Sequence, residues 1–348
     1  MQLKIKTETL KDMVSKAIKG AENNKLIPLT SLMAIELKNN TLKIITSDAT
    51  NYLYIKQENV VGEDFYVVVQ VEQFSKLISR LTCENVELKI TNNSLEVKGN
   101  GTFIQYPNPL EDFNGSKETE VHLSTIKTIL ASCKPSLAVT MEMPVYTNYY
   151  VGENVLASDT QKIACYKANV LGDNMLISAE LMNLLDVMTE EKIKVGTNDT
   201  NIVFTSKNCD VYGYKAEGVD EFAVDAINGL VEQEFPSKCK LDKSALLAIL
   251  DRISLFVGTY DRNAIKMTFA PDGVNIESKQ SNSIEHIDYV ESTDFNPYVL
   301  WIDIQMLQEQ LKANACDAIE LHYGLDSSIK LVDGNLVQII ALLDTDEE

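Results

Sequence analysis

The chain carries one pattern of a helix, strands, a second helix and strands three times in succession. The first helix of each copy has an apolar residue at an equivalent position, namely Leu10, Ile126 and Leu246. The first hairpin of each copy also has an apolar residue at an equivalent position, namely Leu42, Val155 and Val274. These positions recur at intervals of roughly 115 to 120 residues, which is the length of a domain, whereas solenoid repeats recur at about 20 to 50 residues. The sequence therefore predicts three copies of one domain.

Each copy is predicted to hold two amphipathic helices and roughly eight short antiparallel strands. The predicted helices of the first copy span 8–21 and 71–81, and its strands lie within 32–55, 65–69 and 86–106. Helical spacing returns at 123–133, 181–188 and 246–253, and at Leu307 and Leu311. The fold class is therefore α+β, with helix pairs packed on antiparallel sheets. The predicted domains are 1–117, 118–237 and 238–348, with a connector near 229–240 between the last two.

Three dipeptides predict local turns. Asn39-Asn40 suits the positive φ angles of a tight hairpin. Ser47-Asp48 and Ser158-Asp159 stand at equivalent places in two copies, which is typical of turns rather than of catalytic carboxylates.

Composition narrows the class of protein. A chain of 348 residues with 45% hydrophobic content buries a sizeable core. No apolar run reaches the roughly 18 to 20 residues that span a bilayer, and the first residues lack the apolar core of a signal peptide, so we expect no membrane partner and a cytoplasmic location. Six cysteines and three histidines lie far apart without a Cys-x-x-Cys pair, which predicts reduced thiols and neither a metal site nor a cofactor.

No arrangement of residues predicts catalysis. A phosphate-binding glycine loop is absent from the sequence, and the histidines have no serine or cysteine arranged for a triad. We therefore expect the protein not to be an enzyme.

The charge points in two directions. A formal net charge of −20 opposes non-specific binding to nucleic acid, because lysine and arginine contacts to phosphate supply most of that affinity. The polar faces of the first three helices depart from this background and carry Lys11, Lys16, Lys19, Lys76, Arg80, Lys127 and Lys134. The solvated side of any amphipathic helix also explains such residues, so the pattern alone leaves both interpretations open.

Several segments carry a resemblance over nearly the whole chain. They are 25–37 with 42–48, 157–163, the helix at 246–256, and 337–340. Together they resemble the bacterial-type beta sliding clamp of DNA polymerase III. The resemblance implies a head-to-tail homodimer whose six domains close a ring around double-stranded DNA without reading its sequence. Twelve helices about 9 Å apart would lie on a circle roughly 34 Å across, which leaves somewhat over 20 Å for a duplex.

The resemblance also implies where the ring touches DNA and its second copy. The basic residues named above would face DNA, together with Lys25, which matches a basic position in the family's DNA-facing loop. Phe103 and Gln105 on an edge strand of the first domain would meet Leu255 and Phe256 of the partner. These last two side chains also suit a buried core, so their role stays open at this point.

A third implied site is a hydrophobic cleft between the second and third domains, which takes short peptides from the polymerase and the clamp loader. Its matching positions are Thr160, Gln161, Lys162, Ile163, Leu230, Ile339, Ile340, Leu342 and Leu343. The family's usual basic residue becomes Gln161, and its proline and arginine near the C-terminus become Leu342 and Asp344. With the acidic tail at 345–348, these departures suit a phage-encoded or otherwise divergent member with different clients.

Two other functions are open from the sequence. A non-catalytic acidic repeat protein could bind a polymerase, or mimic DNA, without encircling DNA. An unrelated repeat protein would have a structural or adhesive role and would form no ring. Retention on circular but not on linear DNA separates the clamp from both.

Overall fold

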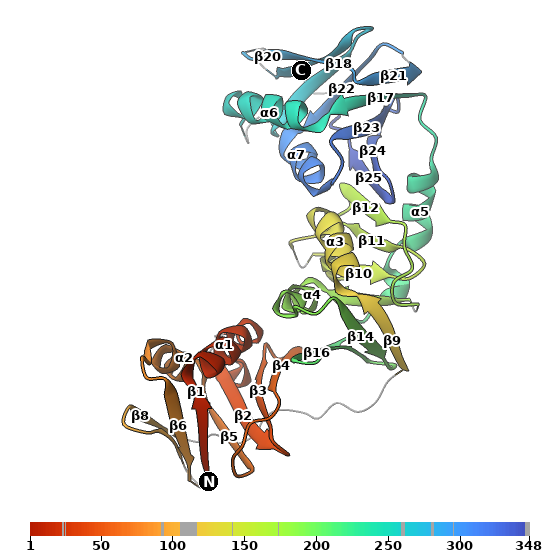
Figure 1. The fold of residues 1–348 in the computed structure, drawn as a ribbon. Helices are drawn as coiled ribbons and strands as arrows, with labels where there is room; N and C mark the ends of the chain where they lie inside the picture. Colours follow the sequence, from red (N-terminus) through yellow and green to blue (C-terminus); the bar gives the residue numbers. More distant parts are fainter. Residues whose placement is uncertain are drawn as a thin grey trace. The chain divides into compact units, whose positions relative to one another are not determined.

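The computed structural model describes residues 1–22, 24, 26–91, 94–104, 117–140, 142–172, 174–258, 262–279, 282–294 and 296–344. The chain forms two compact units, Met1–Thr125 with Ser178–Lys215 and Ile126–Ile177 with Ala216–Glu348. Helices pack on antiparallel sheets in both units (Figure 1), so the predicted α+β class is confirmed.

The first unit contains a four-stranded sheet in the order β1-β6-β7-β8 and an eight-stranded sheet in the order β5-β2-β3-β4-β16-β15-β14-β9. Its strands are β1 (Gln2–Lys6), β2 (Leu32–Lys38), β3 (Thr41–Ser47), β4 (Asn51–Gln57), β5 (Phe65–Gln70), β6 (Asn85–Ile90), β7 (Ser94–Val97), β8 (Gly101–Ile104), β9 (Lys117–His122), β14 (Lys192–Thr197), β15 (Asn201–Thr205) and β16 (Cys209–Tyr214). Its helices are α1 (Thr7–Ala17), α2 (Val71–Arg80) and α4 (Ala179–Leu184), with the 3-10 helices η1 (Ile18–Gly20) and η5 (Leu185–Val187).

Helices α1 and α2 lie against each other and bury the apolar faces that their spacing predicted. Helix α1 buries Leu10, Met13 and Val14, while α2 buries Phe74 and Ile78. Full burial of one such side chain stabilises the fold by about 1.5–3 kcal/mol relative to exposure. Because these faces are directed into the core, the basic residues of both helices are left on the outside.

Strand β4 pairs with β16, so segments far apart in the sequence share one sheet. The Lys56 ammonium group on β4 donates hydrogen bonds to Asp210 Oδ1 at 2.7 Å and to the Ser206 carbonyl oxygen at 2.9 Å. Burial raises the pKa of Asp210, and the hydrogen bond and charge of Lys56 oppose that rise. This ion pair holds the two strands in register.

The second unit contains a nine-stranded sheet in the order β13-β10-β11-β12-β25-β24-β23-β17-β21 and a four-stranded sheet in the order β20-β19-β18-β22. These strands are β10 (Asn148–Val151), β11 (Val155–Ser158), β12 (Lys162–Tyr166), β13 (Met175–Ser178), β17 (Ser237–Asp242), β18 (Ala264–Phe269), β19 (Gly273–Ser278), β20 (Ile284–Asp288), β21 (Glu291–Asp294), β22 (Tyr298–Asp303), β23 (Ala318–Tyr323), β24 (Ser328–Asp333) and β25 (Leu336–Ala341). Its helices are α5 (Val224–Glu232), α6 (Lys243–Ile253) and α7 (Ile304–Ala313), and α3 (Leu123–Cys133) extends into it from the first unit.

One core of this unit lies beneath α6 and α7, which contact each other. Leu246 and Leu250 of α6 and Leu307 of α7 are fully buried in it. Deeper in the same core, the rings of Phe269 and Tyr323 stack with centroids 3.9 Å apart. The apolar residues that the sequence places at helical spacing thus form the packing face of both helices.

The sequence predicts a connector near 229–240. The structure instead has the regular helix α5, which begins before this segment and extends into it. Its buried residues Ile227 and Val231, with the half-buried Val224, fall at i, i+3 and i+7, and this spacing was the available signal. The predicted helix at 181–188 is the shorter α4 followed by η5. The three-domain division stays a prediction, since the two compact units follow shared sheets instead of the repeats.

Within the part of the chain that the structure describes, no helix combines the length and the hydropathy needed to cross a bilayer.

Candidate functional site

The turn between β11 and β12 carries the first predicted cleft residues. Ser158 Oγ accepts a hydrogen bond from the Thr160 amide, and Asp159 Oδ1 accepts hydrogen bonds from the amides of Gln161 and Lys162. These acceptors stabilise a left-handed backbone at Thr160, where φ is 74°. The side chains of Thr160 and Gln161 are exposed at the tip of this turn.

The equivalent turn after β3 is built in the same way. Ser47 Oγ accepts from the Ala49 amide, and Asp48 Oδ1 accepts from the Thr50 and Asn51 amides. The interpretation of both serine-aspartate pairs as turn-forming residues is confirmed. The hairpin prediction is confirmed too, with φ angles of 51° and 60° at Asn39 and Asn40.

Lys162 follows this turn but does not reach the surface. The residue is 8% exposed. Its Nζ donates a hydrogen bond to Glu309 Oε2 on α7 at 2.8 Å and lies 3.5 Å from Asp159 Oδ2. Lys162 therefore connects β12 to α7 inside the second unit, and its ammonium group is not available to a ligand.

Ile163 and Ile339 are opposite each other where β12 pairs with β25. Both are buried in an apolar cluster that also contains Ile227 and Val231 of α5. Helix α5 thus covers the sheet face on which these two predicted cleft residues lie. The next residue, Ile340, is fully buried in the other core, beneath α6 and α7.

The C-terminal residues after β25 form hydrogen bonds with other backbone groups of the second unit. The Leu342 amide donates to the Ser327 carbonyl oxygen, and the Leu343 amide donates to the Trp301 carbonyl oxygen at 2.9 Å. Both leucine side chains are half-buried. Leu230 on α5 is 39% exposed. The accessible members of the predicted cleft are therefore Thr160, Gln161, Leu230, Leu342 and Leu343.

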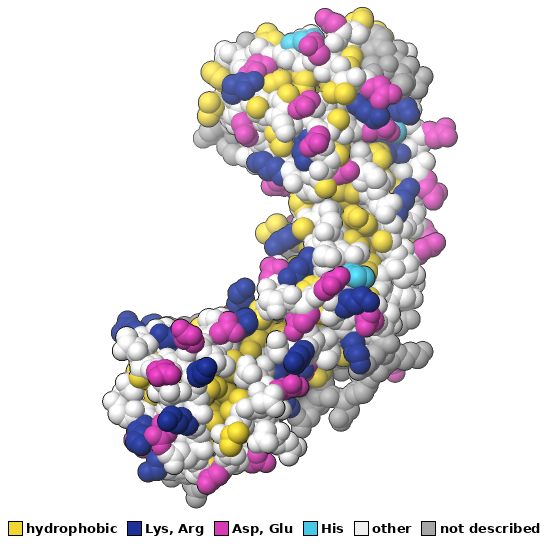
Figure 2. Space-filling view, viewed as in Figure 1, with side chains coloured by type: hydrophobic (Ala, Val, Ile, Leu, Met, Phe, Trp, Pro, Cys, Tyr) yellow, Lys and Arg dark blue, Asp and Glu magenta, His cyan; other side chains and the backbone are white. Residues whose placement is uncertain are grey.

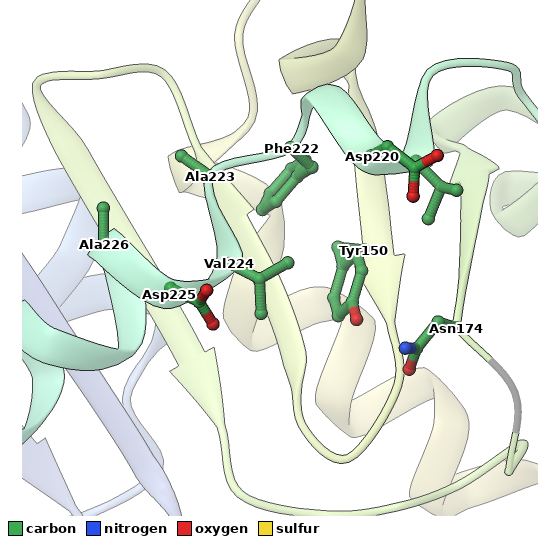
Figure 3. Close-up of a pocket in the computed structure, with 9 residues that line it drawn as sticks. Tyr150, Asn174, Asp220, Phe222, Ala223, Val224, Asp225 and Ala226 are labelled. Atoms are coloured by element: carbon green, nitrogen blue, oxygen red, sulfur yellow. The ribbon is translucent and has the colours of Figure 1, made fainter.

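A pocket of about 400 Å³ lies at the N-terminal end of α5 (Figure 3). It is lined by Tyr150, Asn174, Val219, Asp220, Phe222, Ala223, Val224, Asp225 and Ala226. Tyr150 and Phe222 belong to the same apolar cluster as Ile163 and Ile339, so the pocket continues the sheet face that the cleft residues share. The sequence reading missed it, because its residues come from β10, the segment before β13 and the start of α5, which only the fold brings together.

The basic residues of α1 and α2 fall into two groups. Lys16 and Lys76 form ion pairs with Asp12 and Glu72 one helical turn earlier, at 2.7 Å and 2.5 Å. Among the residues that the structure describes, Lys11, Lys19 and Arg80 have no such partner.

The structure describes two of the three remaining basic candidates. Lys127 is half-buried on α3, and Lys134 is exposed at its end. Lys25 lies outside the described residues. Figure 2 shows Lys and Arg side chains interspersed with Asp and Glu on the visible face, so basic charge does not form one continuous patch there.

Two sheet edges are the sites of the predicted dimer contact. Strand β8 ends the four-stranded sheet of the first unit, and its Phe103 packs edge-on against Phe74 with ring centroids 5.4 Å apart. Gln105 lies outside the described residues. In the second unit, strand β20 ends a sheet and contacts α6. The 3-10 helix η7 (Ser254–Phe256) follows α6, and in it Leu255 is 80% exposed and Phe256 51% exposed. The alternative that Leu255 and Phe256 form a buried core is wrong for the single chain.

An ion pair supports the second of these edges. The Arg252 guanidinium on α6 donates from Nε to Glu285 Oε1 on β20 at 2.8 Å and from Nη2 to Glu285 Oε2. The hydrogen bond from Arg252 lowers the pKa of Glu285 against a small opposing effect of burial. Ile284, the neighbouring residue on β20, is 60% exposed. The ion pair therefore links α6 to the β20 edge, while the apolar side chain of Ile284 on that edge faces solvent.

The chain was compared with known proteins. The family model described as DNA polymerase III beta subunit, N-terminal domain, matches residues 1–116. The beta sliding clamp of Bacillus subtilis (strain 168) is 20% identical over 333 residues, which cover 85% of this chain and 86% of the relative. That of Staphylococcus aureus (strain Mu50 / ATCC 700699) is 21% identical over 354 residues and 93% of each chain. The crystal structure of the DNA polymerase beta subunit of Streptococcus pyogenes matches with a TM-score of 0.88 and 15% identity, and covers 99% of this chain and 100% of that chain.

The chain thus has the fold of the DNA polymerase beta subunits over nearly its whole length. Residues 1–116 match the family model of the N-terminal domain of the DNA polymerase III beta subunit. The resemblance to the beta sliding clamps that the sequence predicted is confirmed, by the family match in the first third and by the fold over nearly the whole chain.

Proposed function

We propose that this chain is the subunit of a DNA sliding clamp, a homodimeric ring that encircles double-stranded DNA and keeps a polymerase on it. The observation that carries the proposal is the match of fold over 99% of the chain to a DNA polymerase beta subunit. In such a ring the topological link, and not a strong contact, prevents dissociation. The protein then needs no catalytic group and acts on DNA in the cytoplasm.

Ring closure requires a head-to-tail interface, in which two different surfaces of the chain meet. Strands β8 and β20 supply two such surfaces, because each ends a sheet and carries backbone groups that can pair with another strand. Phe103 on one edge and Leu255, Phe256 and Ile284 beside the other provide apolar side chains for the contact. Gln105 completes the first surface in the proposal.

Contact with DNA is assigned to the basic residues of the paired helices. Lys11, Lys19 and Arg80 are the strongest candidates, because they have no carboxylate partner among the described residues, whereas Lys16 and Lys76 share their charge with Asp12 and Glu72. Lys25, Lys127 and Lys134 extend the set. Binding through a few such residues is sequence-independent and weak at physiological salt, which lets a ring slide. The net charge of −20 keeps DNA away from the remaining surface.

Client binding is assigned to the accessible cleft residues of the second unit. These are Thr160, Gln161, Leu230, Leu342 and Leu343, and short segments of a polymerase and a clamp loader are the proposed ligands. The domains assigned to the repeats are 1–117, 118–237 and 238–348.

The proposal is tested by loading the protein on nicked circular DNA with a clamp loader and then linearising the DNA. A sliding clamp stays on the circle at about 0.2 M salt and is lost when the DNA has free ends, because only topology holds it. Light scattering should give twice the mass of one chain. Equal loss from circular and linear DNA would overturn the proposal and favour an acidic protein that binds a polymerase without encircling DNA.

A further inference from the structure

We propose that the pocket at the N-terminal end of α5 binds an arginine side chain of a client peptide, next to the apolar segment that the cleft takes. The inference rests on the proposed function and adds a specificity to it. Three features of the pocket carry it, which are an aromatic wall, two carboxylates and a tyrosine hydroxyl without a partner.

The wall of the pocket is aromatic. The rings of Tyr150 and Phe222 stack with centroids 5.3 Å apart and planes inclined by 25°. The ring of Tyr146 packs against Phe222 from another side, at 5.1 Å. Val224 adds an apolar surface, as Figure 3 shows. A planar cation gains attraction from such a wall, because the face of an aromatic ring is negative.

Two carboxylates lie at the rim. In Figure 3, Asp225 lies on one side of Tyr150 and Asp220 on the other. Both aspartates are exposed, and within the described residues neither has an ion-pair or hydrogen-bond partner. The N-terminus of α5 would by itself attract an anion, and a single acidic residue there is common. Two carboxylates reverse this preference, so the pocket selects a cation.

The hydroxyl group of Tyr150 is the third feature. Tyr150 is only 6% exposed, yet it lines the pocket, and its hydroxyl has no hydrogen-bond partner in the part of the chain that the structure describes. Asn174 Oδ1 lies nearby, since a Cβ built on Gly152 would be 2.6 Å from that oxygen and 3.0 Å from the tyrosine oxygen. Because Tyr150 lines the pocket, a bound donor can reach this hydroxyl and give it a hydrogen bond. The dipole of α5 explains an acidic residue such as Asp225 in its first turn but leaves this hydroxyl unexplained.

Arginine satisfies these groups better than lysine does. Its guanidinium is flat, stacks on aromatic faces and presents five donors in a fixed plane. The pocket offers acceptors on several sides, from Asp220, Asp225, Asn174 and the Tyr150 hydroxyl. The pocket lies at the start of α5, the helix that also carries the accessible cleft residue Leu230, so the arginine would belong to the same peptide as the apolar residues.

The test measures binding of two small probes to the full-length protein by ligand-observed NMR. N-acetyl-arginine N-methylamide carries the cation, and N-acetyl-citrulline N-methylamide has the same size without the charge. We expect the arginine probe to bind about tenfold more tightly than the citrulline probe, and less tightly as salt rises. Asp220→Asn and Asp225→Asn should each remove most of this preference. Glu221→Gln, an exposed neighbour that does not line the pocket, should leave it unchanged.

Tyr150→Phe separates binding from folding. This variant removes a hydroxyl that bonds to nothing described in the fold, so the melting temperature should not fall, while affinity for the arginine probe should drop about threefold or more. Equal binding of the two probes to a protein that is retained on circular DNA would overturn the arginine site alone. Loss of retention on circular DNA in the unmutated protein would overturn the proposed function.

Discussion

The Nζ of Lys162 on β12 donates a hydrogen bond to Glu309 Oε2 on α7 at 2.8 Å, and this contact joins two segments of the second unit that are distant in the sequence. The lysine side chain is 9% exposed and the glutamate side chain 54% exposed. Removing the glutamate and removing the lysine should therefore change the free energy of unfolding by different amounts.

Glu309→Gln should lower the free energy of unfolding by about 1–3 kcal/mol, because it leaves a buried ammonium group with one carboxylate, Asp159, at 3.5 Å. Lys162→Met should cost less than about 1 kcal/mol, since it removes the buried charge and lets Glu309 return to water. Urea denaturation measures both. Glu217→Gln, an exposed residue of the same unit, serves as the control. A larger loss in Lys162→Met than in Glu309→Gln would contradict this account.

The dimer contact is tested at Phe256. Phe256→Arg should convert the dimer to monomers, because the substitution places a charge in the apolar centre of the proposed interface, which costs several kcal/mol there. Static light scattering measures the mass. Val139→Arg changes a side chain that is 96% exposed outside this surface and should leave the dimer intact. An unchanged dimer in Phe256→Arg would remove Leu255 and Phe256 from the interface.

The client cleft is tested at Leu343, whose amide bonds to the carbonyl oxygen of Trp301. Leu343→Glu should weaken binding of a polymerase-derived apolar peptide at least about tenfold, which corresponds to about 1.4 kcal/mol. Trp301 is the one tryptophan of the sequence, so its fluorescence reports on this region without a label. Val290→Glu replaces an exposed apolar residue elsewhere in the unit and should bind normally. Unaltered affinity in Leu343→Glu would exclude this end of the chain from the site.

Contact with DNA is tested by charge reversal on the helices. Lys19→Glu and Arg80→Glu should shorten the residence time on circular DNA at low salt, and each lost phosphate contact should reduce the salt slope by about 0.9. Lys76→Glu should have a smaller effect, because Lys76 already shares its charge with Glu72. Lys4→Glu, which changes an exposed lysine on strand β1 and not on either helix, provides the matched control. Residence times that change equally in all four variants would indicate a dependence on net charge only.

The ion pair at the β20 edge predicts a dependence of stability on pH. Hydrogen bonding to Arg252 holds the pKa of Glu285 below its ordinary value of 4.5. A carboxylate with a lowered pKa contributes stability above the unfolded pKa and loses it as pH falls through the folded one. Unfolding free energies of the unmutated protein and of Glu285→Gln should therefore differ at pH 7 and converge below pH 4.5. A constant difference between pH 7 and pH 3 would contradict the assignment.

Much of the local structure could be predicted because it depends on neighbours in the sequence. The apolar spacing of Leu10, Met13 and Val14 makes a helix wherever it is placed, and the Asn39-Asn40 and Ser47-Asp48 turns are formed by their own side chains and amides. The recurrence of such segments predicted the α+β class, while the likeness to the beta sliding clamps came from a resemblance in particular segments, such as 157–163. Helix α5 was missed because its apolar stripe is short and lies where a link between copies was expected.

The candidate site could be predicted only in part. Matching positions found the strands β12 and β25, but they did not show that Lys162 points inward to Glu309 or that Ile340 belongs to the opposite core. Sequence spacing cannot give these directions, because they depend on which element covers each face of the sheet. The same holds for the pocket of Tyr150, Asp220 and Asp225, whose members are separated by about 70 residues and meet only in the fold.

The sequence by itself therefore determined the fold class, since that follows from local periodicity and from the order of helices and strands along the chain, and it carried the resemblance to the beta sliding clamps. The tertiary structure decided which of the candidate side chains are accessible. The physical reason is that strand pairing of β4 with β16 and of β12 with β25 connects the repeats into shared sheets, and burial on those sheets is set by residues that are distant in the sequence.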